Sequence, residues 1–210
     1  MRLIGEKVDL VVQEQDSMEN FSIKTLEVAG FAATVQALRL PFKKECRSLV
    51  YTGLNFEFNE DNFSYMDTLV HVKFDPKDLH LMQVLVKRGD EHAKAIRGIV
   101  AYAEIEAPVY WWCELETYRA GHERLSSEST MHVDCKGLSG EELVKVKSEI
   151  PMGKVLKKVD MFSYQCLRNI VKQRKGHRLP EWAEFIAWVE SLPFAKELIL
   201  IGLDNEAAGN

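Results

Sequence analysis

The residues best suited to do chemistry lie in a short basic segment near the end of the chain, residues 168–178. The protein carries a formal net charge of −5, yet this segment contains five lysines and arginines and no acidic residue. A local reversal of charge in an acidic protein is typical of a site for a small anion. We therefore expect residues 168–178 to take part in binding an anionic small molecule.

Arg174 is the most informative residue of this segment. On a helix it extends an apolar stripe, because it stands seven, four and three residues after Leu167, Ile170 and Val171. A guanidinium on a mostly buried face needs an anionic partner. That partner could be a ligand phosphate or carboxylate, or a salt bridge within the protein, for instance to Glu114 or Glu116. Three other cations fall on a different face, where we expect solvent: Arg168, Lys172 and Lys175.

A second group of polar side chains follows an aromatic helix in the middle of the chain. The alternating run over 99–107 predicts a strand with one buried face, and Pro108 then suits the first turn of a helix. The tryptophans and Tyr118 of this region are more typical of a core than of a flavin or base platform. We expect the loop after the helix to converge with Arg174 on one phosphate-sized pocket. That loop holds Gly121, His122, Arg124, Ser126, Ser127, Glu128, Ser129 and Thr130.

Several other kinds of site lack their sequence motifs. Histidines and cysteines occur without HxH, HExxH or CxxC spacing, so no metal site is expected. The absence of GxSxG, Walker and GxGxxG motifs argues against hydrolase, P-loop and Rossmann proteins. The four cysteines lie far apart, which is typical of reduced thiols in a cytoplasmic protein.

The composition is that of an ordinary globular protein. We expect one domain, 1–210, with 46% hydrophobic and 28% charged residues. The net charge of −5 argues against a general nucleic-acid or membrane-surface binder. Charged residues interrupt the apolar residues at the start of the chain, which is not typical of a signal peptide. No apolar run approaches the roughly 20 residues of a membrane span. We expect a cytoplasmic protein with neither nucleic-acid nor membrane partners.

Spacing patterns predict an alternation of strands and helices. Strands are expected at 7–14, 48–57 and 67–74, with a turn at 59–62. Helices are expected at 20–40, from Asp75 to Gly89, at 152–175 and from Pro180, with shorter helical or apolar elements at 141–149 and 196–203. This order predicts an α/β (α+β) fold with a central mixed sheet flanked by helices.

Four segments, read together, resemble the flavin-dependent thymidylate synthases, a class unrelated to the cysteine-dependent enzyme. Residues 91–94 stand where that family has a Gly-His-x-Ser/Thr turn, and 107–119 where it has an xAPxxxxxQxxRHR helix. Residues 126–132 stand in the place of the SxNExSxR loop. Residues 150–174 stand in the place of the LP…NxRxxxNxxxxR segment. The resemblance covers about residues 77–190.

The chain departs from the family pattern at several signature positions. The first Arg and the His of the Arg-His-Arg triplet are Thr117 and Tyr118, and the Gln near the pyrimidine is Glu114. The remaining replacements lie in the loop and the last helix: Ser127, Thr130, His132, Ser163 and Gln165. Because the chemistry of a site decides function, the resemblance supports the family's fold more strongly than its activity.

The resemblance implies a homotetramer with FAD sites between subunits. Reduced flavin would deliver hydride to the pyrimidine of dUMP, methylenetetrahydrofolate would supply the carbon, NADPH would reduce the flavin again, and dTMP would be the product. The residues that would face FAD are His92, Tyr118, Arg119, Asn169 and His177. The residues that would surround the nucleotide are Glu114, Glu128, Ser129, Thr130, Lys147 and Arg174, with Arg174 and Glu128 as the catalytic pair.

Three functions remain open at this level. The first is a flavin-dependent transferase of one-carbon units to pyrimidine nucleotides. In such an enzyme Glu114 would change which base edge the site accepts, because a carboxylate only accepts hydrogen bonds whereas an amide also donates them. A cytosine-type or modified base is then a conceivable substrate. The second is a non-catalytic relative that binds a nucleotide or serves as an interaction protein. The third is an unrelated α/β protein.

Overall fold

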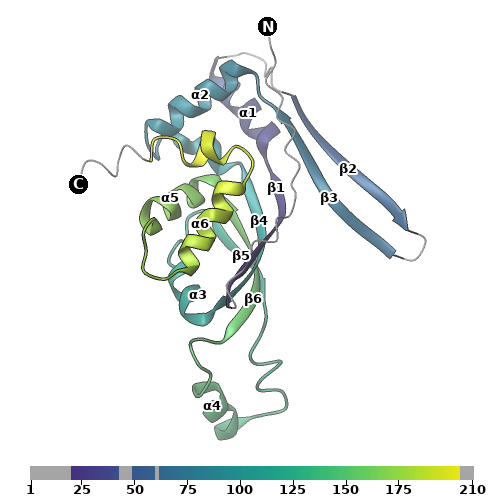
Figure 1. The fold of residues 1–210 in the computed structure, drawn as a ribbon, viewed down its shortest axis with the longest axis vertical. Coiled ribbons are helices and arrows are strands. Elements are labelled where there is room, and N and C mark those ends of the chain that lie inside the picture. The colour runs from purple at the N-terminus through teal and green to yellow at the C-terminus, as the bar shows by residue number, and fades with distance from the viewer. Residues whose placement is uncertain (1–19, 43–48, 60–61, 204–210) are drawn as a thin grey trace.

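The computed structural model describes residues 20–42, 49–59 and 62–203 (Figure 1). Its centre is a four-stranded sheet in the order β1-β4-β6-β5. These strands are β1 (Ser22–Ala29), β4 (Val100–Pro108), β6 (Val155–Ser163) and β5 (His122–Ser127). A second sheet is a two-stranded hairpin of β2 (Leu49–Asn59) and β3 (Asn62–Lys73), which stands apart from the first in Figure 1.

Helices cover one face of the sheet and both of its ends. The covering elements are α5 (Tyr164–Arg174), α6 (Glu181–Ser191) and the π-helical turn η3 (Ala195–Ile199). The upper end in Figure 1 carries α1 (Phe31–Arg39), η1 (Leu40–Phe42), α2 (Pro76–Lys87) and η2 (Ala93–Arg97). The lower part carries α3 (Val109–Leu115) and, farthest from the sheet, α4 (Gly140–Ser148).

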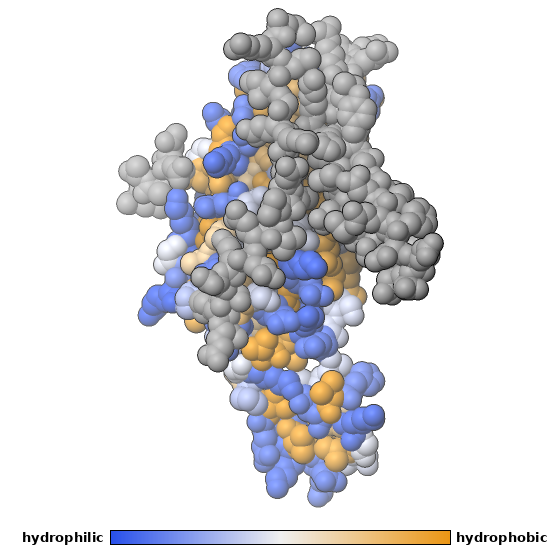
Figure 2. Space-filling view, turned by 45° about the vertical axis from the view of Figure 1, so that its right-hand side comes forward, coloured by the Kyte–Doolittle hydropathy of each residue, from blue (hydrophilic) through white to orange (hydrophobic). Residues whose placement is uncertain are grey.

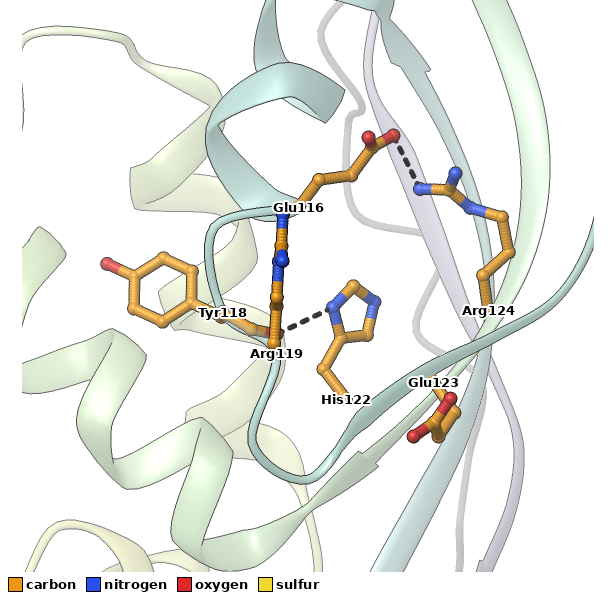
Figure 3. A pocket seen from close by; sticks show the side chains of 6 residues that line it. All are labelled: Glu116, Tyr118, Arg119, His122, Glu123 and Arg124. Atoms are coloured by element: carbon orange, nitrogen blue, oxygen red, sulfur yellow. Dashed lines mark hydrogen bonds and ion pairs between the residues drawn. The ribbon is translucent and has the colours of Figure 1, made fainter.

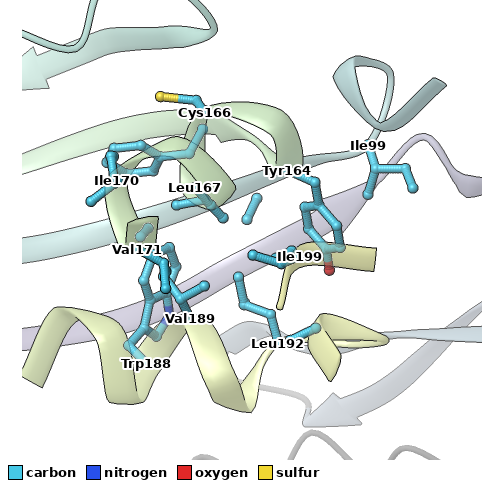
Figure 4. Close-up of a cluster of buried hydrophobic side chains, with 14 of the residues drawn as sticks. Ile99, Tyr164, Cys166, Leu167, Ile170, Val171, Trp188, Val189, Leu192 and Ile199 are labelled. Carbon is cyan, nitrogen blue, oxygen red and sulfur yellow. The ribbon is translucent and has the colours of Figure 1, made fainter. Parts of the chain in front are cut away.

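The core lies between the sheet and the helices that cover it. Alternate residues of β4 are buried, and they are the small or branched residues Ala101, Ala103, Ile105 and Ala107. Small side chains on this face let the helices approach closely. Figure 4 shows the apolar side chains of α5, α6 and η3 meeting above the sheet.

The tryptophans belong to this core, as the sequence predicts. Trp111 and Trp182 are fully buried with ring centroids 5.0 Å apart, and Phe185 packs against both rings. The other two are buried as well: Trp112 and Trp188. The indole N–H of Trp112 donates to the carbonyl of Ala107 at 2.9 Å, so this ring is fixed at the junction of β4 and α3.

The predicted α/β (α+β) class with a central sheet between helices is confirmed. The sheet is antiparallel at all three of its pairings rather than mixed, with β4 paired to β1 and β6, and β6 to β5. Among the described helices, none has the length and apolar character needed to cross a membrane.

The predicted helix at 20–40 is wrong over its first half. Residues Ser22–Ala29 form the edge strand β1, and only Phe31–Arg39 form a helix. Gly30 separates the two with a φ of +96°, and a Cβ there would lie 1.8 Å from the carbonyl oxygen of Gly98. Leu26, which lies at helical spacing from the apolar residues that follow, is 46% exposed and does not face the core. The pairing with β4 overrides their helical spacing.

The predicted helix at 152–175 is also wrong in its first half. Residues 155–163 form the inner strand β6, and the helix begins only at Tyr164, where the Ser163 hydroxyl accepts a hydrogen bond from the Cys166 N–H at 3.1 Å. The buried face of β6 carries Lys158 and Asp160. Charged residues at inward positions conceal the alternation that identifies a strand.

The segment after α3, expected to be a loop, contains the strand β5. Its pairing with β6 is regular except for a shift between Arg124 and Ser126. Only His122 is buried in this edge strand, so the sequence carries no alternating apolar signal.

The remaining element predictions fare better. Strands near 48–57 and 67–74 are confirmed as β2 and β3. The helix after Asp75 is confirmed with its cap, since the Asp75 carboxylate accepts from the Lys77 N–H at 2.8 Å. The helix after Pro180 and the short elements near 141–149 and 196–203 are confirmed as α6, α4 and η3. The predicted strand at 7–14 and the centre of the turn at 59–62 lie outside the described residues.

The segment around α4 extends from the body of the protein as a separate lobe (Figures 1 and 2). No residue of α4 is buried. Figure 2 shows apolar groups among the charged ones on this lobe. The large apolar side chains exposed there are Met131, Val133, Val144 and Met152.

Candidate functional site

Arg174 ends α5 with its guanidinium enclosed by four side chains from other parts of the chain. Nε donates to the Tyr118 hydroxyl at 2.9 Å, and Nη1 donates to Oε2 of Glu114 at 2.8 Å. Nη1 also lies 3.1 Å from Nε2 of His177. The guanidinium carbon stands 4.6 Å from the centre of the Trp182 ring, a cation–π arrangement. The Arg174 side chain is only 17% exposed.

Glu114 neutralises this guanidinium. Its Oε2 accepts from Arg174 and, at 2.9 Å, from the indole N–H of Trp182, and it lies 3.6 Å from Nε2 of His177. Of the two internal partners that the sequence suggests for Arg174, Glu114 is therefore the one used. Glu116 pairs with other cations.

The chain turns back immediately after Arg174. Gly176 has a φ of +78°, a conformation that favours glycine, and the N–H of His177 donates to the carbonyl of Arg174 at 2.9 Å. The Nδ1 of His177 accepts from the Leu179 N–H at 3.2 Å, which holds the ring against the guanidinium. The end of a helix also favours a cation, because the helix dipole is negative there.

A pocket of about 400 Å³ opens beside this cluster, between the end of α3 and the start of β5 (Figure 3). Tyr118 belongs both to the Arg174 cluster and to the pocket, since its hydroxyl accepts a hydrogen bond from Arg174 and Tyr118 is one of the residues that line the pocket. The full lining is Glu116, Tyr118, Arg119, His122, Glu123 and Arg124.

Charges of alternating sign continue from the pocket into the protein. Glu116 accepts from Arg124 at 2.7 Å and from Lys158 at 3.3 Å. The Lys158 ammonium lies 4.3 Å from the centre of the Trp112 ring. Burial, followed by the charge of Arg124, lowers the pKa of Lys158. Partial burial by itself would raise the pKa of Glu116, but Arg124 and Lys158 outweigh it and lower that pKa.

His122 connects the pocket to the sheet. Its ring stacks on Phe162 with centroids 4.7 Å apart and planes 2° from parallel. Nδ1 lies 3.1 Å from the carbonyl oxygen of Tyr118, and Nε2 lies 3.1 Å from Oδ2 of the fully buried Asp160. The preceding Gly121 has a φ of +79°, and a Cβ there would lie 2.3 Å from the Ser163 hydroxyl. The tight turn therefore places His122 over the sheet.

The serine-rich segment forms a second polar group at the far end of β5. The Glu128 carboxylate accepts from the N–H of Lys157 at 2.9 Å, and Lys147 from α4 donates to the Thr130 hydroxyl. The carbonyl of Ser129 accepts from the N–H groups of His132 and Val133, both at 3.1 Å. Four residues predicted to surround a nucleotide thus lie within one region: Glu128, Ser129, Thr130 and Lys147.

This second group lies at the opposite end of β5 from the Tyr118 turn that contacts Arg174. Glu128 follows His122 by six residues, and a strand rises about 3.3 Å per residue, so the two lie roughly 20 Å apart. The turn that holds Tyr118 is at the His122 end of β5, and the serine-rich segment is at the other end.

The predicted cofactor residues fall in two places. Tyr118 and His177 both contact Arg174, and exposed Arg119 lines the adjacent pocket. His92 is the N-cap residue of η2. The Gln165 side chain links η2 to α5, since it accepts a hydrogen bond from Arg97 and donates one to the Asp90 carbonyl at 3.1 Å. Asn169 lies one helical turn after Gln165 on α5.

The prediction of a solvated Arg168 is wrong. Its side chain is buried, and Nη1 donates to the carbonyl oxygens of Ile199 and Ile201 at 2.5 and 2.8 Å. It thus satisfies carbonyls at the end of η3. Lys172 and Lys175 are exposed, as predicted.

Sequence reasoning missed the buried part of the charge network. Lys158 and Asp160 alternate with Phe162 along β6, and that spacing of two is the signal that could have placed them on one face. Within the described part of the chain, no three His, Cys, Asp or Glu side chains gather as a metal site would require.

Comparison with known proteins identifies the fold. No family model matches the sequence, and no curated protein matches it. Among solved structures, thymidylate synthase X (ThyX) of Helicobacter pylori, bound to FAD and dUMP, is similar at 13% identity and a TM-score of 0.58, over 85% of this chain and 97% of that one. A UMP/dUMP methylase, PolB of Streptomyces cacaoi, bound to 5-Br dUMP, is similar at 11% identity and a TM-score of 0.53, over 87% and 96%. This chain therefore has a ThyX-like fold.

Proposed function

We propose that this protein binds a pyrimidine nucleotide and FAD and transfers a one-carbon unit to the pyrimidine ring. Methylenetetrahydrofolate and NADPH would be the co-substrates, dUMP or a related nucleotide the acceptor, and the cytoplasm the place of action. Support for the nucleotide comes from the ThyX-like fold, since the similar structures contain FAD and dUMP or a brominated dUMP.

One observation carries the proposal: Arg174 is a largely enclosed guanidinium among aromatic rings, beside a pocket. Its contacts with Tyr118 and Glu114 use Nε and Nη1. A phosphate or carboxylate is the natural further partner for such a group, because a guanidinium presents five N–H donors in one plane. Trp182 and Tyr118 supply aromatic surface next to that charge.

The residues around the pocket fit FAD in charge and in hydrogen-bonding type. Arg119 and Arg124 supply donors for a diphosphate, Tyr118 supplies a ring, and His177 lies beside Arg174. When bound, the flavin would supply hydride. The chain's own part would be to orient the nucleotide through Arg174 and to hold the base near Glu114, which can only accept hydrogen bonds from it.

A second copy of the chain would complete the site. Glu128 is roughly 20 Å along β5 from His122, and Ser129, Thr130 and Lys147 lie with it at that far end, away from the Tyr118 turn that contacts Arg174. We propose a homotetramer in which the lobe around α4 brings these residues to a neighbour's Arg174.

A second function is favoured by the Glu114–Arg174 pair. The guanidinium already has an internal counter-ion at 2.8 Å, and Thr117 and Tyr118 stand in place of the Arg and His of the family triplet. A non-catalytic relative that binds a nucleotide weakly, or that acts in a complex, would show both features.

Arg174→Ala tests the proposal. We expect the wild-type protein to bind dUMP in isothermal titration calorimetry and Arg174→Ala to lose at least about tenfold in affinity, since a charged hydrogen bond contributes about 1.5–3 kcal/mol. Arg178→Ala, in the same basic segment but at an exposed position, is the matched control and should bind normally. Circular dichroism should show all three proteins folded.

Flavin content separates the two functions. The enzyme should purify yellow or take up added FAD, and should release tritium from dUMP labelled at carbon 5 when the co-substrates are added. A protein that binds dUMP but takes up no flavin would favour the non-catalytic relative. Normal dUMP binding by Arg174→Ala would refute the role of this arginine.

A further inference from the structure

His122 stands between two hydrogen-bond acceptors. The carbonyl oxygen of Tyr118 lies 3.1 Å from Nδ1, and the carboxylate of Asp160 lies 3.1 Å from Nε2. A neutral imidazole carries one N–H and can donate to only one of them. The doubly protonated ring donates to both, and its positive charge faces the buried carboxylate.

Loss of the imidazole proton forces a choice between these acceptors. A carboxylate is a stronger acceptor than a carbonyl oxygen, so the neutral ring keeps its remaining proton on Nε2, toward the buried Asp160. Nδ1 then presents a lone pair to the Tyr118 carbonyl, and the two repel each other. The turn then keeps the hydrogen bond from the Ser163 N–H to the Gly121 carbonyl at 2.7 Å, but the Tyr118 carbonyl loses its hydrogen bond from His122.

Tyr118 carries this effect to the candidate nucleotide site. Its carbonyl is the His122 partner, while its hydroxyl accepts from Nε of Arg174 at 2.9 Å and its ring lies 5.5 Å from the guanidinium carbon. One residue thus joins the buried His122–Asp160 pair to the side chain proposed to bind phosphate.

We propose that His122, held by Asp160, is a positioning residue that fixes Tyr118 against Arg174 when protonated and releases it when neutral. The inference rests on the proposed nucleotide site for its effect on affinity. The site would therefore be better formed while the ring is doubly protonated than after it has lost that proton.

Other ionisable groups surround this pair and are common to the variants below. Arg124 of β5 places Nε 3.6 Å from Oδ1 of Asp160 and also binds Glu116. Lys158 of β6 meets Glu116 from the other side. Arg119 and Glu123 line the pocket, the Cβ of Cys166 on α5 lies near Gly121, and His177 contacts Arg174 directly.

Asp160→Asn is the decisive variant for this proposal because asparagine has nearly the same shape as aspartate. Its amide can donate to Nε2, so a neutral ring with its proton on Nδ1 satisfies both neighbours and holds the Tyr118 carbonyl at any pH. The dUMP dissociation constants of the wild type and of Asp160→Asn should agree at about pH 6. At about pH 8.5 the wild type should bind about three- to tenfold more weakly than Asp160→Asn, the size of one hydrogen bond.

Comparing the two proteins at each pH cancels the titration of the dUMP phosphate and of His177, which both proteins share. His122→Gln should bind weakly at both pH values, and His80→Gln, at an exposed position on α2, should follow the wild type. A ratio of wild-type to Asp160→Asn affinity that is constant across pH would overturn the inference.

Failure of dUMP to bind would count against the proposed function but not against the coupling of His122 to Arg174. A measurement without ligand then tests that coupling. The indole N–H of Trp182 donates to Glu114 beside Arg174. Its ¹H–¹⁵N signal should move with the protonation of the His122 ring in the wild type and stay still over that range in Asp160→Asn. Signals that move equally in both proteins would refute the coupling.

Discussion

Replacing Glu114 by Gln should strengthen the binding of a phosphate-bearing ligand while weakening the fold slightly. The carboxylate lies 2.8 Å from Nη1 of Arg174 and would therefore stand close to any anion bound to that guanidinium. Two charges about 5 Å apart repel by roughly 3 kcal/mol at an effective dielectric constant of about 20.

Solvent reduces this repulsion, because the Glu114 side chain is 33% exposed. We therefore expect a gain nearer 1.4 kcal/mol, which is about tenfold in affinity for dUMP or inorganic phosphate. The amide can still accept from Trp182, but the ion pair with Arg174 becomes a hydrogen bond from a charged donor to a neutral amide, at a cost of about 1 kcal/mol in the free energy of unfolding.

Calorimetric titration and urea unfolding measure the two effects separately. Deoxyuridine, which has no phosphate, is the matched ligand and should gain nothing from Glu114→Gln. A gain for deoxyuridine equal to that for dUMP would mean that the effect comes from the contact of Glu114 with the base and not from the charge of the phosphate. Unchanged or weaker binding of dUMP and phosphate would refute the electrostatic reasoning about Arg174.

Two further predictions concern the scaffold of the site. Gly121→Ala should lower the free energy of unfolding by about 2 kcal/mol or more in urea denaturation, because its φ of +79° and the nearby Ser163 hydroxyl leave no room for a Cβ. Gly137 has the same φ and open space around it, so Gly137→Ala should cost clearly less. Equal losses in the two variants would contradict the steric argument. The hydrogen bond to Glu181, with burial and the Glu181 charge, raises the pKa of Tyr110 to about 12, so this tyrosine stabilises the fold fully below about pH 10 and loses that contribution as the pH rises to about 12. In an ultraviolet titration, Tyr110→Phe should lack one of the phenols that ionise at the highest pH in the wild type. Loss of a phenol that ionises at lower pH would show that the raised pKa does not belong to Tyr110.

The prediction for Arg174 shows what local pattern can determine. Its position on the stripe of Leu167, Ile170 and Val171 follows from helical periodicity alone, and the structure accordingly encloses it. The same periodicity cannot choose between an internal and an external anion, since both satisfy a buried guanidinium equally well. Only the folded chain shows Glu114 in contact with it.

The predictions for 20–40 and 152–175 failed for the opposite reason. Both segments begin as strands whose partners are distant in sequence, β4 for β1 and β4 with β5 for β6. Strand pairing draws its stability from those partners, so residues such as Lys158 and Asp160 can lie inward once Glu116, Arg124 and His122 meet them.

A helix cap and the burial of large aromatic residues follow from the chemistry of the residues, and the sequence by itself determined them: Asp75 caps α2 and the tryptophans are buried, as residue chemistry alone would predict. Which polar groups meet was decided only by the tertiary structure. The Tyr118 turn joins His122, Asp160 and Arg174 from three separate elements, and β5 holds the serine-rich segment roughly 20 Å away from His122. Contacts between distant residues depend on how the sheet orders its strands, and no spacing within one segment encodes that order.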